Sequence, residues 1–300
     1  MSSSQSYVFC VNDKFADFIR VPILSILYNN SNEKVNIYII TDYISEYNKK
    51  NIKQTSNLFN NSKIEFLIID DKKLKHLKTG NWPIHAWYRI LIPELLDNKT
   101  KRVLYLDADT LVLQNLSKLF NLNLSNKSIA ASIDYQDLFD YPFERCGYSK
   151  EKQYICSGIM LINLDYWRKN NLTEKIIKWA KDNEDNIKCP DQDAINFICQ
   201  DSKIILPMKY GVMDCFLINP IFKEAGYSKQ IQECIDNPII IHFNGCPPWY
   251  KEYNRHTLHN EWEKYNQMLE KPVKRHYQAK GILKVKIILN QLLNKVGIKK

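Results

Sequence analysis

The sequence has no Cys-x-x-Cys pair, no secretory signal and no long uncharged apolar run. Its 8 cysteines lack the spacing of a zinc site, and a chain of 300 residues does not need a disulfide framework. The Met-Ser-Ser-Ser-Gln-Ser start lacks the basic and apolar regions of a signal peptide. No uncharged apolar run reaches the roughly 18 to 20 residues of a membrane-spanning helix. We therefore expect a cytoplasmic protein with reduced thiols and no transmembrane segment.

Acidic residues are absent from the end of the chain. Residues 271–300 hold nine Lys or Arg and no Asp or Glu, so the remaining residues carry no net charge. A charge confined to the tail argues against nucleic acid as a partner and for one local anionic partner. From Gly281 onward, apolar residues recur at spacings of three and four while the lysines cluster elsewhere on the helical wheel. This pattern predicts a basic amphipathic helix on an anionic membrane surface, and a helix docked on the domain is the alternative.

Glycine is also scarce, with only 8 residues, whereas Asn, Lys and Ile are frequent, which is typical of an AT-rich bacterial genome. The hydrophobic content of 45% is ample for a packed core. Expected strands over residues 7–11, 35–41 and 63–69 alternate with expected helices over 16–28, 44–59 and 84–91. Further segments are an apolar run at 155–164, helices reaching 180 and over 194–199, and a strand at 239–243. This order predicts an α/β domain over 1–270 with a mixed, mostly parallel sheet flanked by helices, followed by an appendage at 271–300.

Two carboxylates follow an apolar strand near the middle of the chain, in the segment VLYLDADTLV at residues 103–112. Asp107 and Asp109 share one side of an extended chain, because side chains alternate with a period of two. Two hard oxygen ligands held together suit Mn²⁺ or Mg²⁺, and such ions hold phosphates. The alternative is a pair of ordinary aspartates at a strand end or turn.

Four other segments accompany this pair: YRILIPEL at 88–95, SGIMLINL at 157–164, DQD at 191–193, and HFNG at 242–245 with Pro248 and Trp249. With these motifs, the sequence resembles glycosyltransferase family 8 over about residues 7–250. That family comprises retaining sugar-nucleotide enzymes such as bacterial lipooligosaccharide galactosyltransferases and glycogenin. The resemblance implies a GT-A fold, with a Rossmann-like nucleotide-binding half, and a hexosyltransferase activity. It also implies Mn²⁺ (or Mg²⁺) held by Asp107, Asp109 and His242.

The resemblance further implies a donor site and a sugar site. The residues expected at the donor are Cys10, Val11, Asn12, Phe15, Arg89, Asp107, Ala108, Asp109, Gly245 and Cys246. The residues expected at the donor sugar and acceptor are Asp134, Cys156, Asp191, Gln192 and Trp249, of which Gln192 and Asp191 are the catalytic candidates. Gly245 suits a close approach of backbone to phosphate. Each assignment has a structural alternative: Phe15 in the core, Arg89 exposed on a helix, or Asp191 as a helix cap.

Three departures from the family pattern concern the donor. Residues 12–15 read Asn-Asp-Lys-Phe where Asp-Asp-Asn-Tyr is frequent, and Cys156 takes the place of an Asn. The usual Gly-x-x-Lys-Pro-Trp is shorter by one here, at residues 245–249, and lacks its lysine. Lys251 or Lys14 are the candidates to replace it. These changes bear on the identity of the donor more than on the fold.

The expected reaction moves glucose or galactose from UDP-glucose or UDP-galactose to a hydroxyl of a glycan acceptor. The preferred mechanism is front-face attack, with Arg89 at the leaving group and Gln192 supporting the anomeric centre. A double displacement through Asp191 or Gln192 stays open. A membrane-bound tail would place the enzyme on the inner face of the cell membrane, with a lipid-linked saccharide as acceptor.

Two other functions compete with this one. Residues 106–111 also match the nucleophile strand of haloacid-dehalogenase-type phosphatases, but no glycine of the chain is followed by Asp, as the later metal motif of that family requires. The third possibility is a non-catalytic binder of UDP-sugars or glycans, which the Cys156 and missing-lysine departures motivate.

Overall fold

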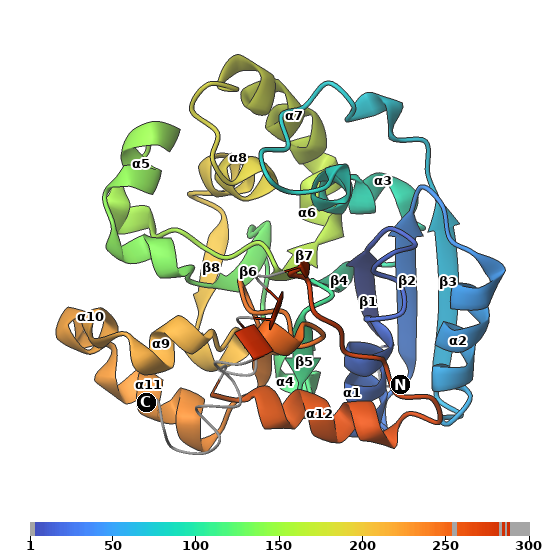
Figure 1. Cartoon of the computed structure of the whole chain (residues 1–300). Coiled ribbons are helices and arrows are strands. Elements are labelled where there is room, and N and C mark those ends of the chain that lie inside the picture. Colours follow the sequence, from blue (N-terminus) through green and yellow to red (C-terminus); the bar gives the residue numbers. More distant parts are fainter. Residues whose placement is uncertain (1–3, 254–256, 282–283, 286, 289–300) are drawn as a thin grey trace.

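The structure is a computed structural model that describes residues 4–253, 257–281, 284–285 and 287–288. Its centre is a seven-stranded sheet in the order β3-β2-β1-β4-β7-β6-β8 (Figure 1). All neighbouring strands are parallel except β7, which runs antiparallel to both β4 and β6. The strands are β1 (Gln5–Cys10), β2 (Val35–Thr41), β3 (Ser62–Ile68), β4 (Arg102–Leu106), β6 (Ile129–Ser132), β7 (Ile159–Asn163) and β8 (Lys203–Leu206). The expected α/β class and mostly parallel sheet are confirmed.

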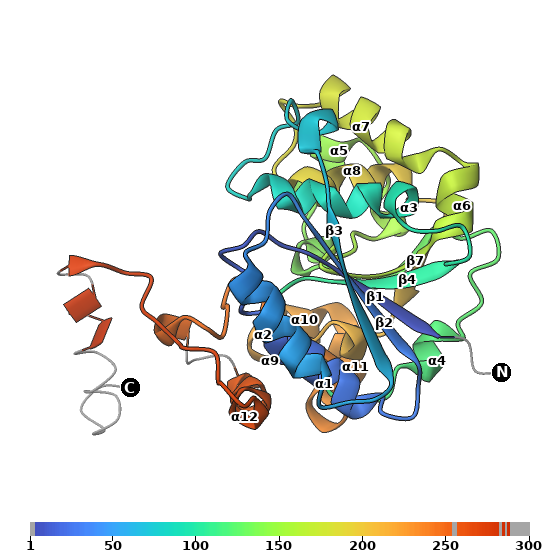
Figure 2. The same ribbon diagram turned by 90° about the vertical axis from the view of Figure 1, so that its right-hand side faces the viewer.

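Helices cover both faces of this sheet. In Figure 2, α1 and α2 lie on one side of the strands, and α3 and α6–α8 lie on the other. The α-helices are α1 (Arg20–Asn29), α2 (Glu46–Ser56), α3 (Ile92–Leu95), α4 (Ser117–Phe120), α5 (Tyr141–Cys146), α6 (Leu164–Lys169), α7 (Leu172–Asp182), α8 (Pro190–Ile198), α9 (Asp214–Ile218), α10 (Pro220–Phe222), α11 (Ser228–Asp236) and α12 (His259–Met268). The 3-10 helices are η1 (Asp71–Lys73), η2 (Ile84–Leu91), η3 (Tyr135–Leu138), η4 (Lys150–Lys152), η5 (Met208–Tyr210) and η7 (Lys251–Tyr253), and η6 (Lys223–Tyr227) is a π-helix.

The two-layer cover explains the apolar runs of the central strands. Along β4, Val103 and Tyr105 join the core beneath α6–α8, whereas Leu104 and Leu106 join the core beneath α1 and α2. A strand buried on both faces needs apolar residues at every position, which is typical of parallel sheets under helices. Asp107 and Asp109, which we call the DxD pair, follow directly after this buried strand.

The elements differ from expectation at three places. The helix expected from residue 16 begins at Arg20, after a series of turns, and residues 84–91 form a 3-10 helix. The helix expected up to residue 180 is interrupted between α6 and α7, where Asn171 adopts a left-handed conformation with φ 51°. Asn tolerates this conformation better than most residues, so it can start a new helix in a new direction.

The C-terminal residues fall into two groups. Residues 271–276 contact the domain, with Val273 buried in its core. The basic amphipathic helix expected from residue 281 onward lies largely outside the described residues. The domain division at residue 270 stays a prediction. Within the described residues, no helix is both long and apolar enough to cross a bilayer.

Candidate active site

The two motif aspartates lie at the carboxyl end of β4, where the chain turns into the short strand β5 (Thr110–Val112). The Asp107 amide donates to the Gly158 carbonyl at 2.8 Å, which ties this turn to the start of β7. β5 pairs with β9 (Ile240–His242) so that Thr110 stands opposite His242. The Phe243 amide then donates to the Asp109 carbonyl at 2.9 Å. This small second sheet brings the late histidine beside the aspartate pair.

The three side chains converge as the metal hypothesis requires. His242 Nε2 lies 3.3 Å from Asp109 Oδ1 and 3.8 Å from Asp107 Oδ2. One ligand atom from each of the three lies within 4.8 Å of the others. Gly158 keeps the space beside them open, since a Cβ there would stand 2.5 Å from His242 Cε1 and 2.6 Å from Asp107 Oδ2. Two carboxylates and one imidazole around such a space fit a divalent cation with open coordination positions.

Neighbouring charges decide the protonation of Asp107 and His242. Burial opposes ionisation of Asp107, but the charges of Arg89 and His242 and the Tyr105 hydroxyl outweigh it and lower the pKa of this carboxyl. Burial also opposes protonation of His242, but Cys156 and Asp109 raise the pKa of the imidazole above its usual value. Asp107 is thus charged at neutral pH, and a positive charge on the His242 imidazole is stabilised.

Arg89 on η2 sits at the centre of a buried polar network. Its Nη2 lies 3.0 Å from Asp107 Oδ1, and its Nε lies 3.2 Å from Asp191 Oδ2. Its Nη1 donates to the carbonyl and the hydroxyl of Ser157 at 2.7 and 2.9 Å. Arg89 is 5% exposed, and its guanidinium stacks over the Tyr105 ring at 4.3 Å. Arg89 therefore joins the aspartate pair to Asp191, and its direct contact with a donor stays a prediction.

α8 presents the two catalytic candidates toward the same region. Ser157 holds both of them: its amide donates to Gln192 Oε1 and its hydroxyl donates to Asp191 Oδ2, each at 2.9 Å. Burial raises the pKa of Asp191, and the Arg89 charge opposes this rise. Burial likewise raises the pKa of Asp134, against hydrogen bonds from Gln136 and Gln192. Asp134 caps η3, where its Oδ1 accepts from the Gln136 amide.

Two adjoining hollows open onto this cluster. The larger, of about 300 Å³, is lined by Cys10, Val11, Asn12, Phe15, Trp82, Pro83, His85, Ala86, Arg89, Tyr105, Asp107, Ala108, Asp109, His242, Asn244, Gly245, Pro247 and Trp249. The smaller, of about 160 Å³, is lined by Trp82, Ala86, Arg89, Asp107, Asp134, Tyr135, Gln136, Cys156, Ser157, Gly158, Cys189, Pro190, Asp191, Gln192, His242 and Asn244. We call them the large and the small hollow. Asp107 and His242 line both, so the group formed by Asp107, Asp109 and His242 lies between them.

The residues expected at the donor and those expected at the sugar line different hollows, with few exceptions. Nine of the ten expected donor residues line the large hollow. Cys246 is not among the described residues that line either hollow. Asp134, Cys156, Asp191 and Gln192, expected at the sugar, line the small hollow, whereas Trp249 lines the large one. Their binding roles remain predictions.

Cys156 and the two lysines were singled out as departures from the family pattern. Cys156 Sγ lies 3.5 Å from His242 Nδ1, on the side of the ring away from the aspartates. Lys14 Nζ lies 5.9 Å from the centre of the Phe15 ring, and Lys251 Nζ lies 5.5 Å from that of Tyr277. Cys156 is thus a neighbour of His242, and the replacement of the missing lysine stays open.

The motifs include the segment SGIMLINL at 157–164, but they assign no role to Ser157 or Gly158. Ser157 orients Asp191 and Gln192, and Gly158 leaves room for the side chains of Asp107 and His242. Tyr105 was also missed, although its hydroxyl donates to Asp107 Oδ1 at 2.5 Å. A small residue pair before an apolar strand, in a chain with so few glycines, was the available signal for Gly158.

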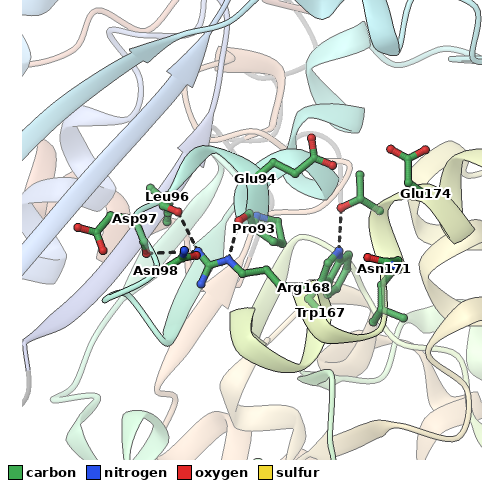
Figure 3. A pocket seen from close by; sticks show the side chains of 11 residues that line it. Pro93, Glu94, Leu96, Asp97, Asn98, Trp167, Arg168, Asn171 and Glu174 are labelled. Carbon is green, nitrogen blue, oxygen red and sulfur yellow. Dashed lines mark hydrogen bonds between the residues drawn. The ribbon is translucent and has the colours of Figure 1, made fainter.

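A separate hollow of about 460 Å³ lies at the end of α3 (Figure 3). There Arg168 donates to the carbonyls of Pro93 and Leu96 at 2.7 and 2.8 Å. The Thr173 hydroxyl accepts from Trp167 Nε1 and donates to the Ile90 carbonyl. These bonds satisfy carbonyls of buried residues at the end of the helical segment that carries Arg89. We assign this region a structural role.

Comparison with known proteins points in the same direction as the geometry. The model of the family described as Glycosyl transferase family 8 matches residues 6–253. General stress protein A of Bacillus subtilis (strain 168) is 32% identical over 267 residues, which cover 86% of this chain and 91% of that protein. Lipopolysaccharide 1,2-glucosyltransferase of Escherichia coli is 31% identical over 235 residues, or 77% and 68% of the two chains.

Solved structures agree at the level of the fold. The galactosyltransferase LgtC, in complex with donor and acceptor sugar analogs, superposes with a TM-score of 0.78 at 19% identity. The match covers 90% of this chain and 98% of that one. The expected GT-A fold is confirmed. The family match also sets aside the phosphatase alternative.

Proposed function

The chain belongs to glycosyl transferase family 8, and on this premise we propose that it is a metal-dependent, retaining hexosyltransferase. Its proposed donor is UDP-glucose or UDP-galactose, and its proposed acceptor is a hydroxyl of a glycan. The observation that carries the proposal is the convergence of Asp107, Asp109 and His242 between the two hollows.

Mn²⁺ is the proposed metal, with Mg²⁺ as the alternative. Asp107, Asp109 and His242 would hold it, and an imidazole among the ligands suits Mn²⁺ better than Mg²⁺. The bound cation would neutralise the negative charge that develops on the nucleoside diphosphate as the sugar departs. Arg89 adds a fixed positive charge on the other side of Asp107, at 3.0 Å, and keeps that carboxylate ionised and oriented.

The large hollow is the proposed site of the nucleotide, and the small hollow that of the transferred sugar. Phe15 and Trp249 give the large hollow aromatic walls suited to a base, and Gly245, which lacks a side chain, would let a phosphate approach its backbone. Asp134 and Gln192 give the small hollow hydrogen-bonding groups for sugar hydroxyls. The names of the relatives, a glucosyltransferase and a galactosyltransferase, support a hexose as the transferred group.

Front-face attack is the mechanism that the contacts of α8 favour. Asp191 Oδ2 is engaged by Arg89 and by the Ser157 hydroxyl, and Gln192 Oε1 accepts from the Ser157 amide. Oxygens held in this way are poor nucleophiles, but their dipoles and charge can support a developing positive charge at the sugar. The acceptor hydroxyl would then attack on the face that the diphosphate leaves, and its proton would pass to the departing phosphate. A covalent sugar trapped on Asp191 or Gln192 would contradict this mechanism.

The proposed acceptor is a lipid-linked saccharide at the inner face of the cell membrane. The basic residues of 271–300 support this, because a patch of Lys and Arg next to apolar residues binds anionic lipid surfaces. Binding to vesicles of anionic lipid, compared with neutral vesicles, tests this part. Equal binding to both would contradict it.

Titration of the protein with Mn²⁺, UDP-glucose and UDP-galactose by calorimetry tests the central proposal. We expect UDP-sugar binding that requires Mn²⁺, and release of UDP when a suitable glycan is added. Asp109→Asn should weaken Mn²⁺ binding by at least tenfold, because one charged ligand is lost. Asp165→Asn is the matched control, since Asp165 is a half-exposed carboxylate paired with Lys101. Equal loss in both variants, or tight UDP-sugar binding without metal, would contradict the proposal.

A further inference from the structure

The chain after α12 returns to the wall of the large hollow. Figure 1 shows that it reverses direction at the end of this helix. The His276 amide donates to the Trp249 carbonyl at 3.0 Å, and the His276 carbonyl accepts from the Lys251 amide at 2.9 Å. Tyr250 and His276 form a parallel bridge. Backbone of the C-terminal segment is thus paired with backbone next to the donor site.

Arg275 adds side-chain bonds to the same stretch. Its Nε donates to the Pro248 carbonyl at 2.7 Å, and its Nη2 donates to the Tyr250 carbonyl at 3.1 Å. One guanidinium therefore spans three consecutive residues whose middle member is Trp249. Hydrogen bonds from a charged donor are stronger than those between neutral groups, so this contact restrains the backbone on both sides of Trp249.

Aromatic rings continue from this segment into the large hollow. The exposed His276 ring stacks on Phe18 at 5.9 Å, and Phe18 stacks on Trp249 at 4.4 Å with an interplanar angle of 3°. Trp249 meets the edge of Phe15 at 6.1 Å. Phe15 and Trp249 line the large hollow. A shift of the segment at its outer end is therefore transmitted to the two aromatic walls through direct contacts.

The start of the segment is anchored to two helices. Arg20 Nη2 of α1 donates to the Lys271 carbonyl at 2.5 Å. The side chain of Asn266 on α12 bonds to the backbone of Val273 twice. Asn266 Oδ1 accepts from the Val273 amide at 2.7 Å, and Asn266 Nδ2 donates to the Val273 carbonyl at 3.2 Å. Val273 itself is 2% exposed. The segment is held at one end by the helices and bears on the donor wall at the other.

We propose that residues 271–276 form a strap that positions the Pro248–Tyr250 wall for nucleotide binding, with Arg275 and His276 as positioning residues. The proposal rests on the proposed function, because it assigns the large hollow to the nucleotide. It divides the C-terminal part by role: the strap is assigned to the donor site, and the residues beyond it are assigned to the proposed membrane surface. The last described residues, which Figure 2 shows apart from the central sheet, fall in the second group.

Four substitutions and two truncations test the strap. Arg275→Met removes the donors but keeps much of the side-chain length, and Lys274→Met removes one positive charge from the exposed neighbouring residue as a matched control. His276→Ala removes the stacked ring and His276→Phe restores one. One truncated chain ends at residue 280 and the other at residue 270. The measurements are the dissociation constant of UDP with Mn²⁺, the KM for UDP-sugar, kcat, and the thermal midpoint.

We expect Arg275→Met and His276→Ala to weaken UDP binding about three- to tenfold and to raise KM in proportion, with kcat changed less than about twofold. Lys274→Met, His276→Phe and the chain ending at 280 should bind UDP as the natural chain does. The chain ending at 270 should lose UDP binding. A purely structural role would lower the thermal midpoint without this separation of KM from kcat.

The outcomes distinguish the two proposals. If the natural chain binds UDP and both Arg275→Met and His276→Ala bind it equally well, the strap is overturned and the proposed function stands. If Arg275→Met does not fold, His276→Ala decides, because its ring is exposed. If the natural chain does not bind UDP with Mn²⁺, both proposals are overturned.

Discussion

Gly158 lies so close to His242 that position 158 has no room for a side chain: a Cβ there would lie 2.5 Å from His242 Cε1. The same Cβ would meet Asp107 Oδ2 at 2.6 Å. Gly158→Ala should therefore displace two proposed metal ligands and weaken Mn²⁺ binding by at least about tenfold. Calorimetric titration measures this, and circular dichroism checks that the variant is folded. Unchanged Mn²⁺ affinity in a folded variant would show that the cluster tolerates the methyl group.

Cys156 is predicted to orient His242, the proposed metal ligand. An imidazole that binds a cation through Nε2 carries its proton on Nδ1, and Cys156 Sγ lies 3.5 Å from that atom. Cys156→Ser keeps an acceptor there, whereas Cys156→Ala removes it. We expect the Ala variant to bind Mn²⁺ about tenfold more weakly and the Ser variant to stay near the natural value. Cys199→Ala, at another buried cysteine, is the control. Equal affinities for the Ala and Ser variants would count against an orienting role.

Gln192 is predicted to act on the chemical step more than on donor binding. Its Oε1 is held by the Ser157 amide at 2.9 Å, so the amide group presents a fixed dipole in the small hollow. Gln192→Ala should lower kcat by about 10²-fold and change the KM for the donor by much less. Gln200→Ala, just after α8, provides the control with the same substitution. Initial-rate kinetics would contradict the assignment if KM rose while kcat stayed constant.

The stability of the protein is predicted to depend on Lys203 above neutral pH. Burial lowers the pKa of Lys203 from 10.5 to about 8. Between these two values the unfolded chain retains the proton that the folded protein has released, so raising the pH favours folding. Between pH 8 and 9 this adds about 1 kcal/mol to the free energy of unfolding.

Urea unfolding at both pH values, compared with Lys203→Met, isolates this contribution from those of other groups. The natural chain should gain stability relative to the variant as the pH rises. Lys175→Met, at an exposed lysine, should follow the natural chain. A constant difference between the natural chain and Lys203→Met across this range would rule out the lowered pKa.

The local sequence predicted the position of an element correctly where one structural rule determines that position. Strand β2 falls on the expected residues 35–41, because an apolar run between turn residues has few alternatives in an α/β chain. The DxD pair was expected just beyond a buried strand and lies there. Motif order along the chain also led to the family and the fold, since the spacing of several weak motifs is more specific than any one of them.

Other features depended on contacts between distant residues. The 3-10 form of η2 and the interruption before α7 reflect packing and one left-handed Asn, which apolar periodicity does not report. Arg89 was expected to face the donor, and its bonds to Asp107, Asp191 and Ser157 are visible only in the folded chain. The strap at 271–276 was assigned to the appendage, because nothing in its composition indicates that its backbone pairs with Tyr250.

The sequence by itself determined the alternation of strands and helices, the burial of β4 and the acidic pair at its end, because these follow from short-range periodicity and chain chemistry. Only the tertiary structure decided that His242 stands 3.3 Å from Asp109, that Gly158 must lack a side chain, and that Arg275 holds Pro248 and Tyr250. Such contacts join residues far apart in the chain, and their geometry depends on how sheets and helices pack around them.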